Sequence, residues 1–405
     1  MKIINILGII LVLGCLYLFS TNREKVDKTM ILKAVVFNVA IAFLLLKFEP
    51  GRAVLKSISD FVTIVLGYGT EGLAFVFGPL ADGGEVFIFA IQVLGNIIFI
   101  SALVGGLFYL GVIGFVVKTI GGFVGKILGT SKVESFVAVA NMFLGQTESP
   151  ILVSKYLSKM TESEIMLVLI SGMGSMSATV LMGYASMGIP MEYLLIGGAL
   201  VPFGSIVVSK ILMPEEDLKE SQNLDNSLTD NSDDVTIDNK GNNENLIAAI
   251  SQGSIDGLNM ALGIGASLIA ITSIVALLNG GLSMVGLSLE TILSYVFAPM
   301  GFLMGLPMND VLFASELLGT KLVLNEFVAF GVLGEVIGNL DYRSGLMMAI
   351  SLTGFANIAS MGICISGISV FCPDKRNLLS RLAFKGMVGG FVVSFLSCLV
   401  VGLFV

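Results

Sequence analysis

Long uncharged stretches alternate with short charged segments along the 405 residues of this chain. Several of the uncharged stretches reach the ~20 residues that a helix needs to cross a hydrocarbon core of about 30 Å. They run continuously apolar instead of alternating with a period of two, so they predict helices and not the strands of a membrane barrel. They cover residues 3–22, 34–46, 86–117, 165–191, 193–209, 257–289, 344–373 and 386–405. The pattern predicts an all-α polytopic membrane protein with about eight transmembrane helices.

Two segments near the N-terminus need separate interpretation. Residues 3–22 follow Lys2, as the apolar core of a signal peptide would, but no small-residue cleavage pattern follows them. We therefore expect a retained span. Residues 49–79 mix charged side chains with many apolar ones, which is typical of an amphipathic helix lying in the membrane interface.

The whole net charge of -8 comes from one segment, because residues 214–245 hold ten acidic side chains and two lysines and the rest of the chain is neutral overall. Because this segment is also rich in Asn and Ser, it cannot bury enough apolar surface to fold and predicts a cytoplasmic linker. The expected organisation is N-terminal spans, interfacial helices and a scaffold helix (1–132), a first repeat (133–213), the linker (214–246), a scaffold span with an interfacial helix (247–307) and a second repeat (308–405).

The two halves share a succession of features. Each has a polar interruption between arms of about a dozen residues, which predicts a re-entrant hairpin, followed by a span with a Gly- and Ser-containing break. The interruptions lie at 145–150 in the first half and at 319–321 and 325–326 in the second, and the breaks lie at 172–177 and 354–360. If the hairpins enter from opposite sides, the halves form an inverted repeat with a substrate site near the midplane.

Basic side chains cluster in alternate connections, which the positive-inside rule assigns to the cytoplasm. This predicts a multi-pass protein of the bacterial cytoplasmic (inner) membrane with both termini outside. The basic residues are Arg23, Lys25, Lys28, Lys33, Lys118, Lys126, Lys132, Lys155, Lys159, Lys375, Arg376, Arg381 and Lys385.

The chain has no histidine, and its four cysteines form no CxxC pair. Hydrolytic chemistry of the Ser-His or Cys-His kind and imidazole zinc sites are therefore excluded. We expect no enzyme, no enzyme cofactor and no nucleic-acid partner.

Two glutamates stand at the predicted hairpin tips. Glu148 and Glu326 lie at a depth where burying a charge costs about 2.5–3.5 kcal/mol, so an intramembrane acid indicates a functional site. Gln146, Thr147 and Asn325 flank them, and Asn357 and Ser360 lie in the second break. This set suits a neutral ligand rich in hydroxyl and amide donors. The alternative is that the glutamates pair with Lys321 or cap the hairpin ends.

Three segments resemble the concentrative nucleoside transporter family, in its short bacterial form. They are Asn141 to Pro150 (NMFLGQTESP), Gly319 to Ala329 (GTKLVLNEFVA) and Gly354 to Ser360 (GFANIAS). The resemblance implies a homotrimer in the lipid bilayer, in which each protomer has a scaffold and a moving transport domain. Its substrate would be a nucleoside, with uridine, cytidine or adenosine expected.

The resemblance also implies residue roles. Base-contacting positions fall on Gln146, Thr147 and Glu148, with Val180 lining the base pocket. Ribose-contacting positions fall on Glu326, Asn357 and Ser360, and the pocket aromatic on Phe355. The sodium site falls on Asn141, Leu144, Ser175 and Met176, partly through backbone oxygens.

Retention of Asn141 favours sodium as the coupling ion, because family members that use protons tend to lose this residue. The function expected is therefore a sodium-coupled nucleoside symporter. A proton-coupled symporter, with one of the two glutamates titrating, is the alternative.

Overall fold

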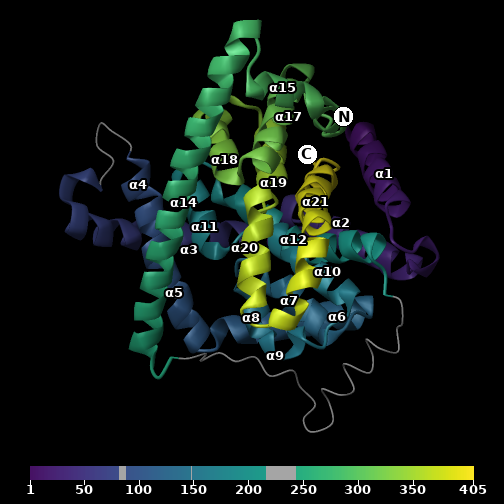
Figure 1. The fold of residues 1–405 in the computed structure, drawn as a ribbon, viewed down its shortest axis with the longest axis horizontal. Helices are drawn as coiled ribbons and strands as arrows, with labels where there is room; N and C mark the ends of the chain where they lie inside the picture. Colours follow the sequence, from purple (N-terminus) through teal and green to yellow (C-terminus); the bar gives the residue numbers. More distant parts are fainter. Residues whose placement is uncertain (82–87, 147, 216–242) are drawn as a thin grey trace.

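The computed structural model describes residues 1–81, 88–146, 148–215 and 243–405. Thr147 and almost all of the predicted acidic linker therefore lie outside the described residues. Every regular element in the described part is a helix, and seven helical segments are long and apolar enough to cross a membrane. The all-α, multi-pass fold predicted from the sequence is confirmed. Figure 1 shows two long helices, α14 (Leu246–Leu282) and α21 (Arg376–Val401), running along the same direction.

Before the first predicted hairpin, the described residues form six α-helices: α1 (Lys2–Leu18), α2 (Lys28–Leu46), α3 (Glu49–Phe77), α4 (Phe89–Gln92), α5 (Leu94–Tyr109) and α6 (Val112–Leu128). The uncharged stretch 86–117 is therefore not a single span. Gly111 has a φ of 78°, a left-handed conformation that glycine adopts without strain, and it separates α5 from α6. Hydropathy alone could not show this turn, because a glycine turn does not interrupt the apolar character of the stretch.

The segment predicted to lie in the interface forms one continuous helix, α3, followed by the turn Gly78–Leu80. Its length and composition would also let it cross a membrane. In Figure 1, however, α3 carries the chain from α2 on the right of the view to α4 on the left, whereas α14 runs up the view. This direction agrees with the interfacial interpretation, which remains a prediction.

The first half continues with α7 (Lys132–Ala140), α8 (Ser149–Leu152), α9 (Ser154–Leu157), α10 (Glu162–Met173), α11 (Ala178–Ser186) and α12 (Met191–Leu212). Capping boxes begin α7 and α10, because Ser131 with Glu134 and Thr161 with Glu164 satisfy backbone N–H groups reciprocally. Helix α10 stops at Met173 and α11 starts at Ala178, so the first predicted break is confirmed.

The second half holds α14 (Leu246–Leu282), α15 (Leu289–Val296), α16 (Ala298–Leu303), α17 (Met308–Val323), α18 (Glu326–Val336), α19 (Tyr342–Leu352), α20 (Ile358–Ser369) and α21 (Arg376–Val401). The break between α19 and α20 is confirmed. At the second tip only Leu324 and Asn325 separate α17 from α18.

One prediction at this tip is wrong, because Gly319, Thr320 and Lys321 belong to α17 and do not interrupt it. A Cβ added at Gly319 would lie 2.7 Å from Leu293 Cβ. The glycine therefore lets α15 approach α17 closely, which is the usual role of small residues between membrane helices.

The two helix breaks lie against each other. Gly354 has a φ of 94°, and the Phe355 N–H donates to Ser175 O over 3.1 Å. A Cβ added at Gly354 would lie 2.7 Å from the Gly174 carbonyl carbon and oxygen. Only glycine fits this crossing, which brings four half-helix ends together inside the protein.

Burial divides the helices into inner and outer ones. Most of the apolar window of α10 and α11 is buried, 94%, whereas only 6% of the α14 window is. The exposed side chains of α14 are largely apolar, and such a surface is stable only against lipid or another protein chain. Figure 1 shows α14 at the edge of the helices that hold the breaks.

Candidate functional site

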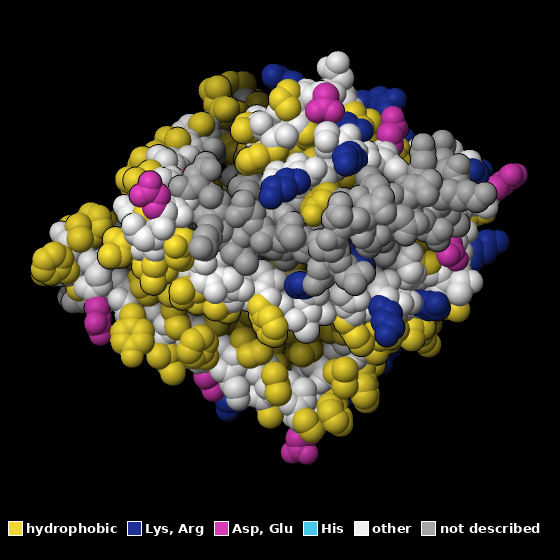
Figure 2. All heavy atoms as spheres, turned by 90° about the horizontal axis from the view of Figure 1, so that it is seen from below, with side chains coloured by type: hydrophobic (Ala, Val, Ile, Leu, Met, Phe, Trp, Pro, Cys, Tyr) yellow, Lys and Arg dark blue, Asp and Glu magenta, His cyan; other side chains and the backbone are white. Residues whose placement is uncertain are grey.

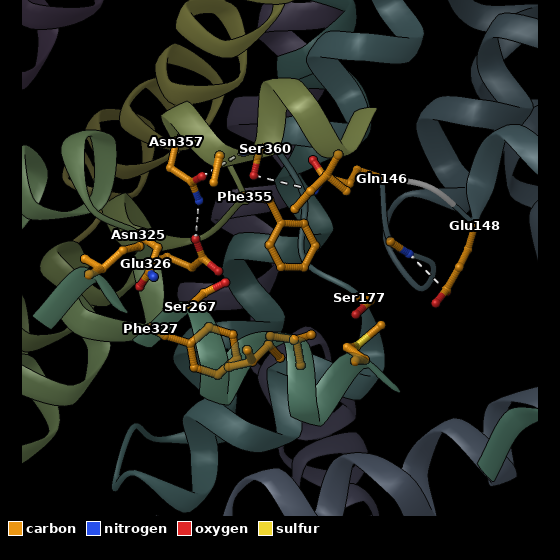
Figure 3. Close-up of a pocket in the computed structure, with 18 residues that line it drawn as sticks. Gln146, Glu148, Ser177, Ser267, Asn325, Glu326, Phe327, Phe355, Asn357 and Ser360 are labelled. Atoms are coloured by element: carbon orange, nitrogen blue, oxygen red, sulfur yellow. Dashed lines mark hydrogen bonds between the residues drawn. The ribbon is translucent and has the colours of Figure 1, made fainter. Parts of the chain in front are cut away.

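A cavity of about 310 Å³ lies where the two hairpin tips, the second break, α11 and α14 meet (Figure 3). Seven of the eight predicted substrate residues line it: Gln146, Glu148, Val180, Glu326, Phe355, Asn357 and Ser360. The eighth, Thr147, lies outside the described residues. Positions more than 200 residues apart in sequence therefore meet at one place.

Glu326 is the most tightly held acid of the cavity. It begins α18, its side chain is 3% exposed, and Asn325 caps the same helix end by accepting from the Val328 N–H at 2.9 Å. One carboxylate oxygen of Glu326 accepts from Asn357 Nδ2 at 2.8 Å and the other accepts from Tyr184 Oη at 3.1 Å. A carboxylate has about four acceptor positions, so two donors leave room for ligand hydroxyl groups.

Asn357 links this acid to the second break. It is the N-cap of α20, and its Oδ1 accepts from the Ser360 N–H at 2.9 Å. Because Oδ1 is used in this way, Nδ2 must face Glu326. The cap thus fixes the orientation of the amide beside the cavity.

Tyr184 is a part of this site that the sequence analysis missed. It is fully buried in α11, and its ring stacks on Phe330 at a centroid distance of 4.3 Å and packs on Phe327 at 4.8 Å. The two rings aim its hydroxyl group at Glu326. A tyrosine hydroxyl group inside a membrane segment needs a hydrogen-bond partner. This requirement could have marked Tyr184 as a candidate site residue in the sequence.

If the cavity binds the nucleoside that the resemblance implies, Tyr184→Phe should weaken uridine binding about three- to tenfold, because one hydrogen bond to a charged group is lost while both ring contacts remain. Equilibrium binding of radiolabelled uridine to the purified protein measures the change. Tyr68→Phe, at an exposed tyrosine of α3, is the control and should bind as the original protein does. Equal uridine affinities for Tyr184→Phe and Tyr68→Phe would show that the Tyr184 hydroxyl group does not contribute to binding.

The opposite wall of the cavity carries Glu148 and Gln146. Glu148 accepts from the Gly145 N–H at 3.2 Å, which is a contact within its own hairpin tip. Gln146 reaches across to the second half, since its Nε2 donates to Ser360 Oγ at 3.5 Å and its Oε1 accepts from the Cys364 thiol at 3.2 Å. Figure 3 shows the two glutamates on opposite sides of the cavity, with the Phe355 ring between them.

Helix α14 closes the cavity with residues that the sequence analysis did not identify: Met260, Gly263, Ile264, Ser267 and Ile271. Ser267 lies on the same side of the cavity as Glu326 (Figure 3). The rest of the α14 wall is apolar. The sequence did not mark these residues as part of a site, because α14 contains no charged side chain after Asp256. Carboxylates at two ends, amides, and an aromatic plane between them suit a planar ligand with hydroxyl and amide groups.

The four predicted sodium positions are buried and lie beside the cavity without lining it. Asn141 follows the last residue of α7, where it donates to Ser171 Oγ at 2.9 Å and accepts from Ser149 Oγ at 2.7 Å. Leu144 belongs to the same tip, and Ser175 and Met176 form the first break. The Ala178 N–H donates to Phe143 O at 2.9 Å and joins the tip to the break.

The alternative that the glutamates simply pair with Lys321 is not supported. Within the described residues, no ion pair includes Glu148 or Glu326. Lys321 instead donates to oxygen atoms of Ser351 in α19, of Thr353 just after α19, and of Ser394 in α21.

Three family models cover most of the chain. The model described as the Na⁺-dependent nucleoside transporter N-terminus matches residues 7–80, the one described as nucleoside recognition matches residues 90–191, and the Na⁺-dependent nucleoside transporter C-terminus matches residues 193–402.

Curated relatives and a solved structure agree with these models. The chain is 35% identical to the nucleoside permease NupC of Helicobacter pylori, covering 100% of this chain and 98% of that one. It is also 35% identical to the uncharacterized transporter YutK of Bacillus subtilis, with 99% of each chain covered. The structure of CNTnw in an inward-facing substrate-bound state superimposes with a TM-score of 0.91 at 33% identity, over 99% of this chain and 98% of that one. The chain therefore belongs to the concentrative, Na⁺-dependent family of nucleoside transporters.

Proposed function

We propose that this nucleoside transporter is a sodium-coupled symporter that imports nucleosides by alternating access of a transport domain within a homotrimer. The observation that carries the proposal is the position of the cavity. It lies between two hairpin tips and a helix break, and the first tip also holds the predicted ion ligands.

The residues at the first tip and the first break fit a sodium ion. The Leu144 and Met176 carbonyl groups belong to residues that are both 3% exposed, and neither accepts a hydrogen bond from the part of the chain that the structure describes. A buried carbonyl group without a partner is uncommon. Hard cations prefer such oxygen atoms, and the Asn141 and Ser175 side chains would add further oxygen ligands.

We assign the ribose to Glu326, Asn357 and Ser360, and the base to the side of Gln146, Thr147 and Glu148. The Glu326 carboxylate, already oriented by Tyr184, would accept hydrogen bonds from ribose hydroxyl groups. Val180 and Phe355 would contact the base and sugar faces, with the apolar wall of α14 opposite. Uridine, cytidine and adenosine are the substrates proposed.

The ion and nucleoside positions share structural elements. A Cβ added at Gly172, next to the first break, would lie 3.2 Å from Gln146 Cα. An ion that orders this break and tip would therefore also shape the nucleoside cavity. Because coupling free energies are reciprocal, sodium should tighten nucleoside binding by the same factor by which nucleoside tightens sodium binding.

The distribution of charge supports the proposed orientation in the inner membrane. In Figure 1, α6, α9 and the junction of α20 with α21 lie at the lower end, and both chain termini lie toward the upper end. Figure 2 looks onto that lower end, where Lys and Arg side chains are numerous. By the positive-inside rule this end faces the cytoplasm and the termini face outward. The exposed apolar face of α14 supports contact with lipid or with neighbouring protomers.

Uptake of radiolabelled uridine into proteoliposomes tests the proposal. We expect a sodium gradient to drive accumulation, and choline in place of sodium to abolish it while the pH gradient is held constant. Accumulation that follows the pH gradient and ignores sodium would instead establish proton coupling.

We also expect Asn141→Ala to raise the sodium concentration needed for half-maximal uptake about tenfold, because it removes one oxygen ligand and two orienting hydrogen bonds. Asn259→Ala, at an exposed position of α14, is the matched control. An unchanged sodium requirement in Asn141→Ala would place the ion elsewhere.

A further inference from the structure

Lys321 is a fully buried cation at the second helix break. Its ammonium group donates to Ser351 O at 3.0 Å, to Thr353 O at 2.6 Å and to Ser394 Oγ at 2.6 Å. An ammonium group has three donors, so all are used. The Phe391 ring centroid lies 5.5 Å from the nitrogen and adds a favourable cation–π contact.

The location of this cation follows from helix electrostatics. Helix α19 ends at Leu352, and the last carbonyl groups of a helix lack intrahelical donors and carry partial negative charge. In a break surrounded by protein, water cannot satisfy them. Lys321 supplies donors and positive charge from the neighbouring hairpin, and so it ties α17 to the break and to α21.

The first half has the same geometry without the lysine. Gly174 and Gly354 occupy equivalent places, because a serine lies three residues before each of them and the N-cap of the next half-helix lies three residues after. Asn141 Nδ2 of the first hairpin donates to the Ser171 hydroxyl group, and the Lys321 ammonium group of the second hairpin donates to the backbone carbonyl group of Ser351, the equivalent residue. A neutral amide thus occupies in one half the role that an ammonium group has in the other.

The two hairpins also differ in charge, because only the second has a basic residue close to its glutamate. Glu326 has Lys321 five residues before it in its own hairpin, whereas residues 133–154 around Glu148 contain no Lys or Arg. We infer that Lys321 is the resident cation of the second break and positions the Glu326 side of the nucleoside site, as sodium does for the first break. This inference rests on the proposed function. One half of the site is then assembled by a side chain of the protein itself, and only the other half requires an added ion.

Uridine binding by two variants tests this positioning role. Lys321→Met removes the charge but keeps most of the side-chain length, and Lys321→Ala also leaves space in which a sodium ion can contact the three freed oxygen atoms. We expect both to lose at least about tenfold in uridine affinity, since bonds from a charged donor are removed. In Lys321→Ala only, we expect high sodium to restore binding, with the Hill coefficient for sodium rising from about one to about two.

A merely structural lysine would not change the number of sodium ions required. Unchanged uridine affinity in both variants would overturn the inference, and so would equal losses with an unchanged Hill coefficient. If neither variant yields folded protein, Ser394→Ala removes a single acceptor and should weaken uridine binding about threefold. No change in Ser394→Ala would then count against the role. Failure of the proposed function is distinct, because the unmodified protein would then bind uridine without sodium dependence or not at all.

Discussion

Replacing Glu326 by Gln should lower the initial rate of sodium-driven uridine uptake at least about 100-fold, because two charge-assisted hydrogen bonds to the ligand are lost. The substitution keeps the shape of the side chain. It removes the negative charge and places an NH₂ group where an acceptor is needed, beside donors from Tyr184 and Asn357. Radiolabelled uptake into proteoliposomes measures the rate.

A second glutamate on the same helix provides the control. Glu335 lies on the exposed side of α18, nine residues after Glu326. Glu335→Gln changes the net charge equally and should transport uridine at the original rate. Concentrative uptake by Glu326→Gln at more than half the original rate would refute the assignment of this carboxylate to the nucleoside.

Gly354→Ala should destabilise the folded protein by about 2–5 kcal/mol, combining the cost of a left-handed alanine with that of overpacking. The added methyl group would lie 2.7 Å from the Gly174 carbonyl atoms and 3.0 Å from Met173 O, which are backbone atoms and cannot rotate away. The two breaks would be pushed apart, and the nucleoside site beside them would be distorted. Thermal unfolding of the detergent-solubilised protein, with and without uridine, measures both effects.

Gly362 is the matched position, because it lies in α20 just after the same break and a Cβ there meets nothing within 4 Å. Gly362→Ala should unfold at the original temperature or slightly above it, because alanine is favoured over glycine inside a helix. If Gly354→Ala also did so and bound uridine normally, the close crossing of the two breaks would not be needed for folding or binding.

The polar residues of the predicted site came from short polar motifs in an otherwise apolar chain, whereas Val180, Phe355 and the sodium positions came only from the family resemblance. Gln146, Glu326 and Asn357 stand out because hydrogen-bonding groups are costly in lipid unless they have partners or a function. The same logic could have identified Tyr184, but its segment also contains several other small polar residues and Glu326 is 142 residues away. Nothing local marked the α14 residues of the cavity wall, since apolar side chains there serve lipid contact and ligand contact alike.

The sequence by itself determined the membrane class, the positions of both helix breaks and the polar residues at the hairpin tips. Continuous apolar runs can exist only as helices in lipid, and Gly with capping Ser or Asn residues ends a helix locally. Only the tertiary structure decided that the two breaks cross at Gly174 and Gly354 and that Tyr184 holds Glu326. It also decided that Lys321 contacts the end of α19 and does not pair with a glutamate. These pairings depend on how distant helices pack, and local sequence does not encode that geometry.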